Sequence, residues 1–374
     1  MLKIAVVGIG NAGNQVAELA KRNGIDGIAL NSSEKDISTL SEVNSLVIGD
    51  EKGAGKDRNI AKQFIQSSIK DLLAEPTFKN VVTDNEVIFV VSSTGGGTGS
   101  GMAPVMVDIL SRVHPKKRFI LVGILPPLKE SVAAQQNTIE YLKEMRQSNP
   151  VYKLYDNNNY ANQPTNKMLS TVNMEIVEDM KVIRGDYQHA TPYNSIDEKD
   201  MLKIIETNGR LVIARAFGMK EKDLDEKDIE QRLIDSLKGN AHAELDRDQI
   251  IKRLGLIVNL NEKVYKSLDT NLPVFKDLVG EPIEGFEHIY LKEAAEEENK
   301  VIAVLSGLSV PDDRIEKIVQ RIQEATAALT RTKESSILDD TATDALDDLR
   351  GTGKKESAGG EVNLDDIFGN YIKK

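Results

Sequence analysis

The sequence predicts an α/β protein with a mostly parallel, doubly wound sheet, then a central helix, a smaller α+β domain and a disordered C-terminal tail. Early in the chain, short apolar runs alternate with segments whose apolar residues recur at helical spacing. Such alternation indicates parallel strands with helices on both faces of one sheet. After about residue 330, charged and small residues replace this pattern, which is typical of disorder.

The expected elements follow in chain order. Strands are predicted over residues 2–7, 25–30, 87–91 and 119–125, and helices over 14–21, 58–73, from about 102, and 167–183. Later elements are a helix from about 197, a helix closed by Gly239, strands over 254–258 and 301–305, and a last helix reaching Leu329. The predicted domains are 1–165, the central helix 166–190, a C-terminal domain 191–330 and the tail 331–374.

The tail ends in an apolar motif. Its members have helical spacing and are Leu364, Ile367, Phe368 and Tyr371. Such a motif after a disordered linker is more often a docking peptide than a piece of core, so we expect an adaptor protein to bind there.

Composition limits the classes of function. The 374 residues carry a net charge of −11, which argues against nucleic-acid binding by the globular body. The chain has no Cys, which excludes disulfides and thiolate metal sites, and its four His are scattered. No apolar run suits a membrane span and the N-terminus lacks a signal-peptide profile, so we expect a cytoplasmic protein without membrane insertion.

A glycine-rich turn follows the predicted strand 87–91. It reads Ser-Thr-Gly-Gly-Gly-Thr-Gly-Ser-Gly over residues 93–101 and precedes a helix. Glycine lets a ligand approach the backbone amides, and the positive end of a helix favours anions. The turn therefore predicts a phosphate site. A flexible linker is the alternative, but linkers rarely join a buried strand to its helix.

The first predicted strand ends in a similar turn. Gly8, Gly10 and Gly13 satisfy the pattern G-x-G-x-x-G, which NAD-dependent enzymes share. Those enzymes also need an acid after the second strand to bind the ribose, whereas here that strand ends in Asn31 and Ser32. The alternative is a tight turn with polar caps. It explains the glycines but does not explain why Asn14 and Gln15 follow them.

These two turns resemble the nucleotide loops of the tubulin/FtsZ superfamily of polymerising GTPases. The resemblance implies GTP or GDP with Mg²⁺ as ligands and self-assembly into head-to-tail filaments. In the first loop it implies nucleotide contacts at Gly10, Asn11, Ala12, Gly13 and Gln15. By that match Asn11 and Ala12 face the phosphates, and Gln15 lies beneath the sugar or base. We call the glycine-rich turn over residues 93–101 the signature loop, and there the implied contacts are Gly95, Gly96, Gly97, Thr98, Gly99 and Ser100.

A third loop reads Gly53-Ala54-Gly55-Lys56-Asp57-Arg58. It is not a Walker loop, because Asp57 stands where that motif needs Ser or Thr. It resembles the loop by which FtsZ and the plasmid- and phage-encoded TubZ proteins sense the γ-phosphate, and the resemblance implies contacts from Gly53, Ala54, Gly55 and Lys56. The basic Lys56 and Arg58 favour the TubZ side. The alternative is an exposed turn with solvated charges, especially at Arg58.

The remaining nucleotide contacts come from the resemblance. Asn173, on the apolar stripe of the central helix, matches the residue that reads the guanine edge, and Leu169 matches the residue that packs on the base. The alternative is a buried amide satisfied structurally. Asn157 is a candidate for a sugar contact, although a plain loop residue is the simpler interpretation. Glu130 matches an FtsZ acid, but Ala134 replaces the Arg expected four residues later.

Asp197 and Asp200 lie three residues apart at a predicted helix start. Ser195 and Glu198 fit a capping box there, which is a structural explanation for the acidic cluster. The superfamily resemblance implies instead that Asp197 and Asp200 belong to a loop that enters the next subunit's nucleotide pocket, where they orient the attacking water. Ser195 departs from the Asn that FtsZ usually has at its position.

The resulting prediction is a GTP-dependent filament protein that hydrolyses GTP between consecutive subunits. A role in plasmid or phage DNA segregation fits the Lys56 loop, with a cell-division ring protein as the alternative. Two other classes stay open: an NAD-dependent oxidoreductase, which leaves the signature loop unexplained, and a nucleotide-binding scaffold that does not hydrolyse.

Overall fold

The computed structural model describes residues 1–219, 226–246, 249–266, 272–292 and 298–334. It divides into two compact units, Met1–Glu324 and Ala325–Lys374. The first contains the sheet and the helices that cover it, and the described residues of the second, 325–334, are helical. The apolar motif predicted at the end of the tail lies outside the described residues. None of the helices in the described ranges is long and apolar enough to cross a membrane.

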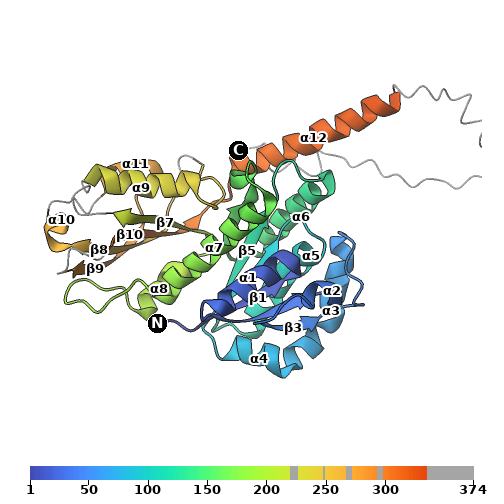
Figure 1. Ribbon diagram of the computed structural model, residues 1–374, viewed down its shortest axis with the longest axis horizontal. Coiled ribbons are helices and arrows are strands. Elements are labelled where there is room, and N and C mark those ends of the chain that lie inside the picture. The colour runs from blue at the N-terminus through green and yellow to red at the C-terminus, as the bar shows by residue number, and fades with distance from the viewer. Residues whose placement is uncertain (220–225, 247–248, 267–271, 293–297, 335–374) are drawn as a thin grey trace, which may run out of the picture. The chain divides into compact units, whose positions relative to one another are not determined.

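One ten-stranded sheet runs through the first unit, in the order β3-β2-β1-β4-β5-β6-β7-β10-β8-β9 (Figure 1). The strands are β1 Ile4–Ile9, β2 Asp26–Asn31, β3 Asn44–Val47, β4 Val87–Ser93, β5 Arg118–Leu125, β6 Val151–Asp156, β7 Gly209–Met219, β8 Arg253–Asn261, β9 Glu284–Lys292 and β10 Asn299–Leu308. The first seven in this order are parallel, and β10 pairs antiparallel with both β7 and β8. The strands expected in a separate C-terminal domain therefore extend the sheet formed by the N-terminal strands.

Helices cover both faces of this sheet. They are α1 Gly10–Arg22, α2 Glu34–Ile37, α3 Arg58–Ala74, α4 Pro76–Thr83, α5 Thr98–Val113, α6 Val132–Ser148, α7 Thr165–Arg184, α8 Glu198–Ile205, α9 Glu226–Gly239, α10 Glu262–Lys266, α11 Pro273–Val279 and α12 Asp312–Glu334, with a 3₁₀ turn, η1, at Asn157–Tyr160. One buried cluster joins the sheet to α1, α7 and α8, and another joins its opposite face to α3, α4, α5, α6 and the start of α12. This is the doubly wound arrangement that the sequence predicted.

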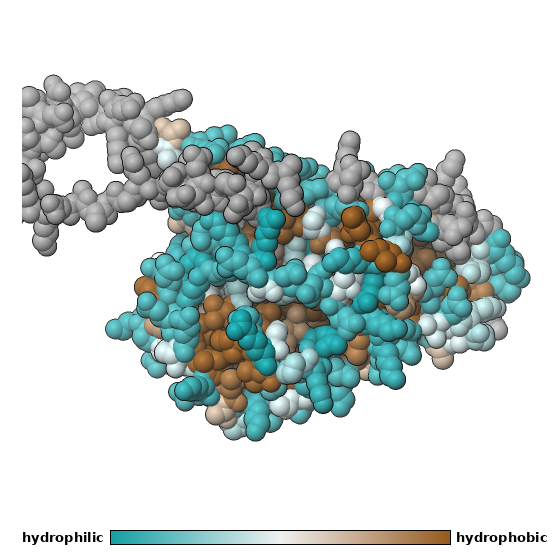
Figure 2. All heavy atoms as spheres, turned by 180° about the vertical axis from the view of Figure 1, so that it is seen from behind, coloured by the Kyte–Doolittle hydropathy of each residue, from teal (hydrophilic) through white to brown (hydrophobic). Residues whose placement is uncertain are grey.

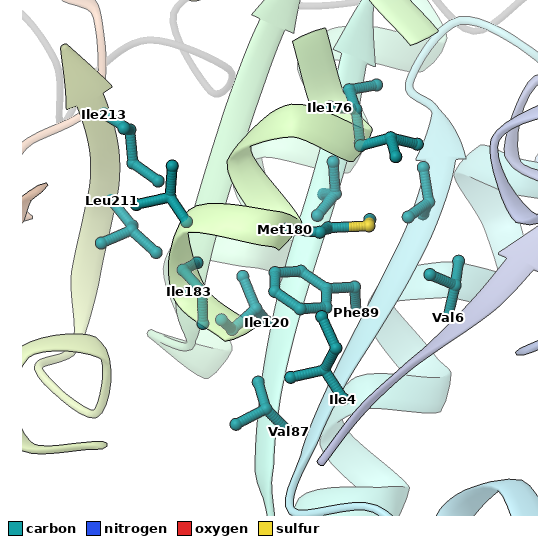
Figure 3. Packing of buried hydrophobic residues seen from close by; sticks show 14 of the residues in the cluster. Ile4, Val6, Val87, Phe89, Ile120, Ile176, Met180, Ile183, Leu211 and Ile213 are labelled. Carbon is teal, nitrogen blue, oxygen red and sulfur yellow. The ribbon is translucent and has the colours of Figure 1, made fainter. Parts of the chain in front are cut away.

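The central helix α7 packs on the strands through a mostly apolar face, in which the buried Asp179 is a charged exception. Met180 lies next to Phe89 and Ile183 next to Ile120 of the sheet, and Ile176 belongs to the same buried cluster farther along the helix (Figure 3). Alternate strand residues point to the other face, as the two-residue period of a strand requires. Burying both faces explains why these strands are continuously apolar. A third cluster, confined to residues 212–308, joins β7, β8 and β10 to α9 and α11. The face that Figure 2 shows is mostly hydrophilic, with several hydrophobic patches between the polar residues.

The parallel register aligns the carboxyl ends of the strands. Ile9 lies beside Leu30 and Ser92, and Leu125 lies beside Asp156. The segments that follow β1, β2, β4, β5 and β6 therefore emerge at one edge of the sheet. Ligands of doubly wound sheets bind at this edge, so the fold brings the predicted loops together.

Candidate functional site

The two glycine-rich turns touch at the carboxyl edge of β1 and β4. Gly10 has a φ of +71°, and a side chain there would lie 3.1 Å from the backbone nitrogen of Gly99. Helix α1 begins at Gly10 and α5 at Thr98, in each case about four residues earlier than predicted. Both turns therefore present the first turn of a helix, whose free amides and positive dipole end favour an anion.

The third loop packs against the signature loop. A side chain at Gly97 would lie only 2.7 Å from the Cα of Lys56, so the two backbones are in contact. Ser32, at the end of β2, accepts from the Gly53 amide at 2.8 Å and lies 2.7 Å from the hydroxyl of Thr98. Ser32 was not among the predicted site residues, although its place at the carboxyl end of a strand was a usable signal. The three loops thus form one contiguous group, which we call the cradle: residues 10–15, 53–56 and 95–100.

Within the cradle, some residues are accessible and others lie beneath it. Asn11 and Gln15 are exposed on one face of α1, with their amides 3.4 Å apart, and Ala12 is half-buried. Gly13 is buried under β4, since a side chain there would lie 2.1 Å from the Val91 carbonyl oxygen. Ser100 is fully buried and its hydroxyl donates to the carbonyl of Gly96. A side chain at Gly96 would instead meet no atom within 4 Å.

Lys56 and Arg58 have different environments. Lys56 is exposed and adopts a left-handed φ of +65°. The expectation that Arg58 might be a solvated charge is wrong. Its side chain is buried and donates to both carboxylate oxygens of Glu144 at 2.7 and 2.9 Å, and to the Ser100 carbonyl at 3.0 Å. Burial alone would raise the pKa of Glu144, but hydrogen bonds from Arg58 and Lys62 outweigh it and hold that pKa below its usual range. Arg58 therefore anchors the loop.

Asn157, Leu169 and Asn173 flank the same edge. Asn157 follows β6 directly, is buried, and its side-chain oxygen has no hydrogen-bond partner within the described ranges. Helix α7 contacts both η1 and α1, so its N-terminal half adjoins the first loop. Leu169 and Asn173 are only half-buried, whereas the expected stripe placed them on the buried face. Their partial exposure leaves both side chains accessible to a ligand.

Glu130 lies in the exposed turn between β5 and α6, and no contact of its carboxylate connects it to the cradle within the described residues. Ala134 stands where an FtsZ-like Arg would be expected. It is buried against Gly95, because a side chain added at Gly95 would lie 3.2 Å from the Ala134 Cβ. A positive charge near the phosphates would therefore come from a residue other than position 134. Within the cradle, Lys56 is the exposed basic residue.

Asp197 and Asp200 lie far from the cradle of their own chain. Glu198, next to Asp197, pairs at 2.8 Å with the amino group of Met1, which precedes β1, whereas Gly10 of the cradle follows β1. Strand β1 alone spans about 20 Å at roughly 3.3 Å per residue. At the other end of α8, Glu206 pairs with Arg118 at the start of β5. The acids thus belong to the amino edge of the sheet.

The capping box predicted at Ser195 and Glu198 is instead formed by Asp197 and Asp200. Asp197 is the N-cap of α8 and accepts from the Asp200 amide at 2.9 Å, while Asp200 accepts from the Asp197 amide at 3.3 Å. Both pairs have the right spacing, and the helix begins two residues later than Ser195 would require. Asp197 is exposed and Asp200 half-exposed.

No group of three His, Cys, Asp or Glu that could hold a metal occurs among the residues that the structure describes. The cradle offers backbone amides and hydroxyls, which suit phosphate oxygens. Mg²⁺ usually keeps several waters and binds through substrate phosphates, so this donor set fits a metal that arrives with a nucleotide.

Comparison with known proteins agrees with this geometry. Residues 3–163 match the model of the Tubulin/FtsZ family, GTPase domain. The chain is 23% identical to the tubulin-like protein TubZ of Clostridium botulinum C phage, over 99% of both chains. The crystal structure of Clostridium botulinum phage c-st TubZ superposes with a TM-score of 0.70 at 21% identity, covering 87% of this chain and 99% of the other.

A GTPγS-form protofilament of Bacillus thuringiensis serovar israelensis TubZ has a subunit of the same fold. It superposes with a TM-score of 0.69 at 16% identity, covering 89% of this chain and 94% of the other. The family match covers every loop of the cradle. Residues 3–163 of the chain therefore match the GTPase domain of the tubulin/FtsZ family.

Proposed function

We propose that this chain binds GTP in the cradle and assembles head to tail, so that Asp197 and Asp200 of one subunit complete the GTPase site of the next. The observation that carries the proposal is the separation of the acids from the cradle across the length of β1. A single subunit cannot bring both to one nucleotide. A heterologous contact between the two edges of the sheet unites them and repeats indefinitely, which generates a filament.

Each part of the cradle has a chemical task in this proposal. The amides of the signature loop and the N-terminus of α5 hold the phosphates, and Lys56 compensates their charge. Asn157 offers its unpartnered oxygen to the sugar hydroxyls. Leu169 packs on the base, and Asn173 gives an amide to the guanine edge. Mg²⁺ would be held by phosphate oxygens and water.

Hydrolysis needs positioning and charge compensation more than covalent chemistry from the protein. The neighbour's carboxylates would orient and polarise the attacking water at the γ-phosphate. Capping uses one oxygen of each carboxylate, which leaves the other free for a water molecule. GTPase activity should therefore depend on assembly. The protofilament of the Bacillus thuringiensis TubZ supports self-association of this fold.

We propose a role in positioning or segregating plasmid or phage DNA, because the chain is similar over its full length to a phage TubZ. A cell-division ring protein is the second candidate. An NAD-dependent oxidoreductase is less well supported, because Ser32 at the end of β2 is bound to the cradle and no acid takes its place. A scaffold that binds but does not hydrolyse would keep the cradle and lose the role of the acids.

Light scattering and phosphate release with GTP and ATP, with NADH binding measured in parallel, test the proposal. We expect GTP alone to drive assembly and phosphate release above a critical protein concentration. Equal assembly with ATP would contradict the guanine assignment, and turnover proportional to protein concentration at all concentrations would contradict the shared site. Removal of residues 331–374 should keep assembly and lose adaptor binding.

A further inference from the structure

Asn137, in the second turn of α6, binds two loops of the cradle at once. Its side-chain nitrogen lies 3.0 Å from the carbonyl oxygen of Lys56 and 3.3 Å from those of Gly95 and Gly96. No sequence motif marks Asn137, and its three partners are 41 to 81 residues away along the chain. One amide group thus binds carbonyls of both the signature loop and the Lys56 loop.

These hydrogen bonds fix the direction of the signature-loop amides. In a trans peptide, the carbonyl of one residue and the N–H of the next lie in one plane and point in opposite directions. The carbonyls of Gly95 and Gly96 point toward Asn137, so the N–H groups of Gly96 and Gly97 point away from α6. Neither N–H has a hydrogen-bond partner within the part of the chain that the structure describes. Both are therefore free to bind an anion.

The hydrogen bond from Asn137 to the Lys56 carbonyl also holds Lys56 in its unusual backbone conformation. A left-handed φ of +65° is unfavourable for a residue with a side chain and persists only where the surroundings impose it. The Lys56 carbonyl is bound by Asn137, and its Cα rests against Gly97. The position of the exposed cation is thus tied to the position of the phosphate-binding amides.

We propose that Asn137 is a positioning residue that aims the Gly96 and Gly97 amides and Lys56 at the phosphates of the bound nucleotide. This inference rests on the proposed function, because it assumes that the cradle holds a phosphate chain. It assigns α6 a functional role through a residue that touches no nucleotide atom itself. An amide nitrogen suits the role because it supplies two donors and no charge.

The test compares Asn137→Ala and Asn137→Asp with Gln136→Ala, an exposed neighbour on the same helix. Affinity is measured for GTP with a fluorescent analogue and for guanosine by NMR titration, and folding is checked by circular dichroism. Asn137→Ala should lower GTP affinity about tenfold or more, as expected when several hydrogen bonds are lost. Guanosine affinity should change less than about twofold, because guanosine has no phosphates. Gln136→Ala should match the wild-type protein in both.

Asn137→Asp provides a pH readout. An ionised carboxylate facing three carbonyl oxygens repels them, so GTP affinity at pH 8 should fall below that of Asn137→Ala. The protonated carboxyl regains one donor, so the affinity should recover as the pH is lowered, and the alanine variant should show no such recovery.

Equal losses for GTP and guanosine, or wild-type GTP affinity in Asn137→Ala, would overturn the positioning role. So would unfolding of both variants, which would make Asn137 a folding residue only. Failure of the wild-type protein to bind GTP would instead contradict the proposed function.

Discussion

Asp197 and Asp200 each accept a hydrogen bond from the other's backbone amide, at 2.9 Å into Asp197 Oδ1 and 3.3 Å into Asp200 Oδ2. This reciprocal pair closes the first turn of α8. It also fixes the two carboxylates side by side, with one oxygen of each left over. Helix capping and a role in a neighbouring subunit's site are therefore compatible, and they can be separated experimentally because only capping works without a charge.

Asp200→Asn should strongly slow hydrolysis with little loss of stability. The Asn side-chain oxygen can still accept from the Asp197 amide, but it cannot polarise water as a carboxylate does. We expect a fall in phosphate release of roughly a hundredfold in filaments that persist, the usual loss when a positioned acid–base group is removed. Asp200→Ala should show the same fall and also lose about 0.5–1 kcal/mol of unfolding free energy. Normal turnover in both variants would leave capping as the only role.

Gly96→Val should block nucleotide binding in a stable protein. A side chain at Gly96 meets no atom within 4 Å, whereas one at Gly97 would collide with Lys56 and one at Gly99 would lie 3.0 Å from the Ile9 carbonyl oxygen. Valine at Gly96 should therefore extend into the cradle and exclude phosphate, with stability changed by less than about 0.5 kcal/mol. Gly239→Val, in equally open space on α9, is the matched control. GTP titration and thermal unfolding of both variants check this, and unchanged GTP affinity in Gly96→Val would contradict the phosphate site.

Local patterns predicted the loops well and the helix starts poorly. The strands β1 and β4 and the glycine-rich turns were readable because apolar runs and glycine spacing are local features. The start of α5 was not, since Thr98 to Gly101 have low helix propensity. Tertiary packing overrides that propensity: a side chain at Gly101 would lie 2.3 Å from the Arg58 carbonyl oxygen, so glycine is needed there for close contact between α5 and α3.

The errors in the predicted site come from contacts that are distant in sequence. Arg58 looked like a solvated charge because its partner, Glu144, is 86 residues away. Asn137 was missed for the same reason. At the start of α8, two pairs of residues fit the capping spacing, and only the fold determines which pair is used. The positions of the loops, however, could be predicted from the expectation of a parallel sheet. In such a sheet the loops that follow the strands lie at one edge.

The buried imidazole of His242 should make stability fall in mild acid. Burial lowers its pKa to about 4, and the nearby positive charge of Lys153 adds to this, although Nε2 lies 3.2 Å from a carboxylate oxygen of Asp179. The unfolded chain, with a His pKa of about 6.5, binds more protons between these values. The stabilisation is therefore complete above pH 6.5 and is lost as the pH falls toward 4, by at most about 1.4 kcal/mol per pH unit.

His242→Phe tests this effect, because phenylalanine can keep the stacking on Tyr155, whose ring centroid is 5.0 Å away. Urea unfolding of the two proteins between pH 4 and 7 should give a shallower slope for the variant. Parallel slopes would show that other groups, such as the buried Asp179, dominate acid unfolding. GTP affinity at pH 7.5 should be the same in both proteins, since His242 is not part of the cradle.

Mixing two inactive variants should restore some hydrolysis if the site is shared between subunits. Gly96→Val retains Asp197 and Asp200 but lacks a working cradle, whereas Asp200→Asn retains the cradle but lacks a full pair of acids. In the mixture, a Gly96→Val subunit can present its acids to the nucleotide of an Asp200→Asn subunit. Such a contact contains a complete site, because the acids and the cradle belong to opposite edges of the sheet. Phosphate release is measured for each variant alone and for the mixture, and electron microscopy of labelled subunits establishes co-assembly. A mixture that co-assembles and releases no more phosphate than the variants alone would place the whole site within one subunit.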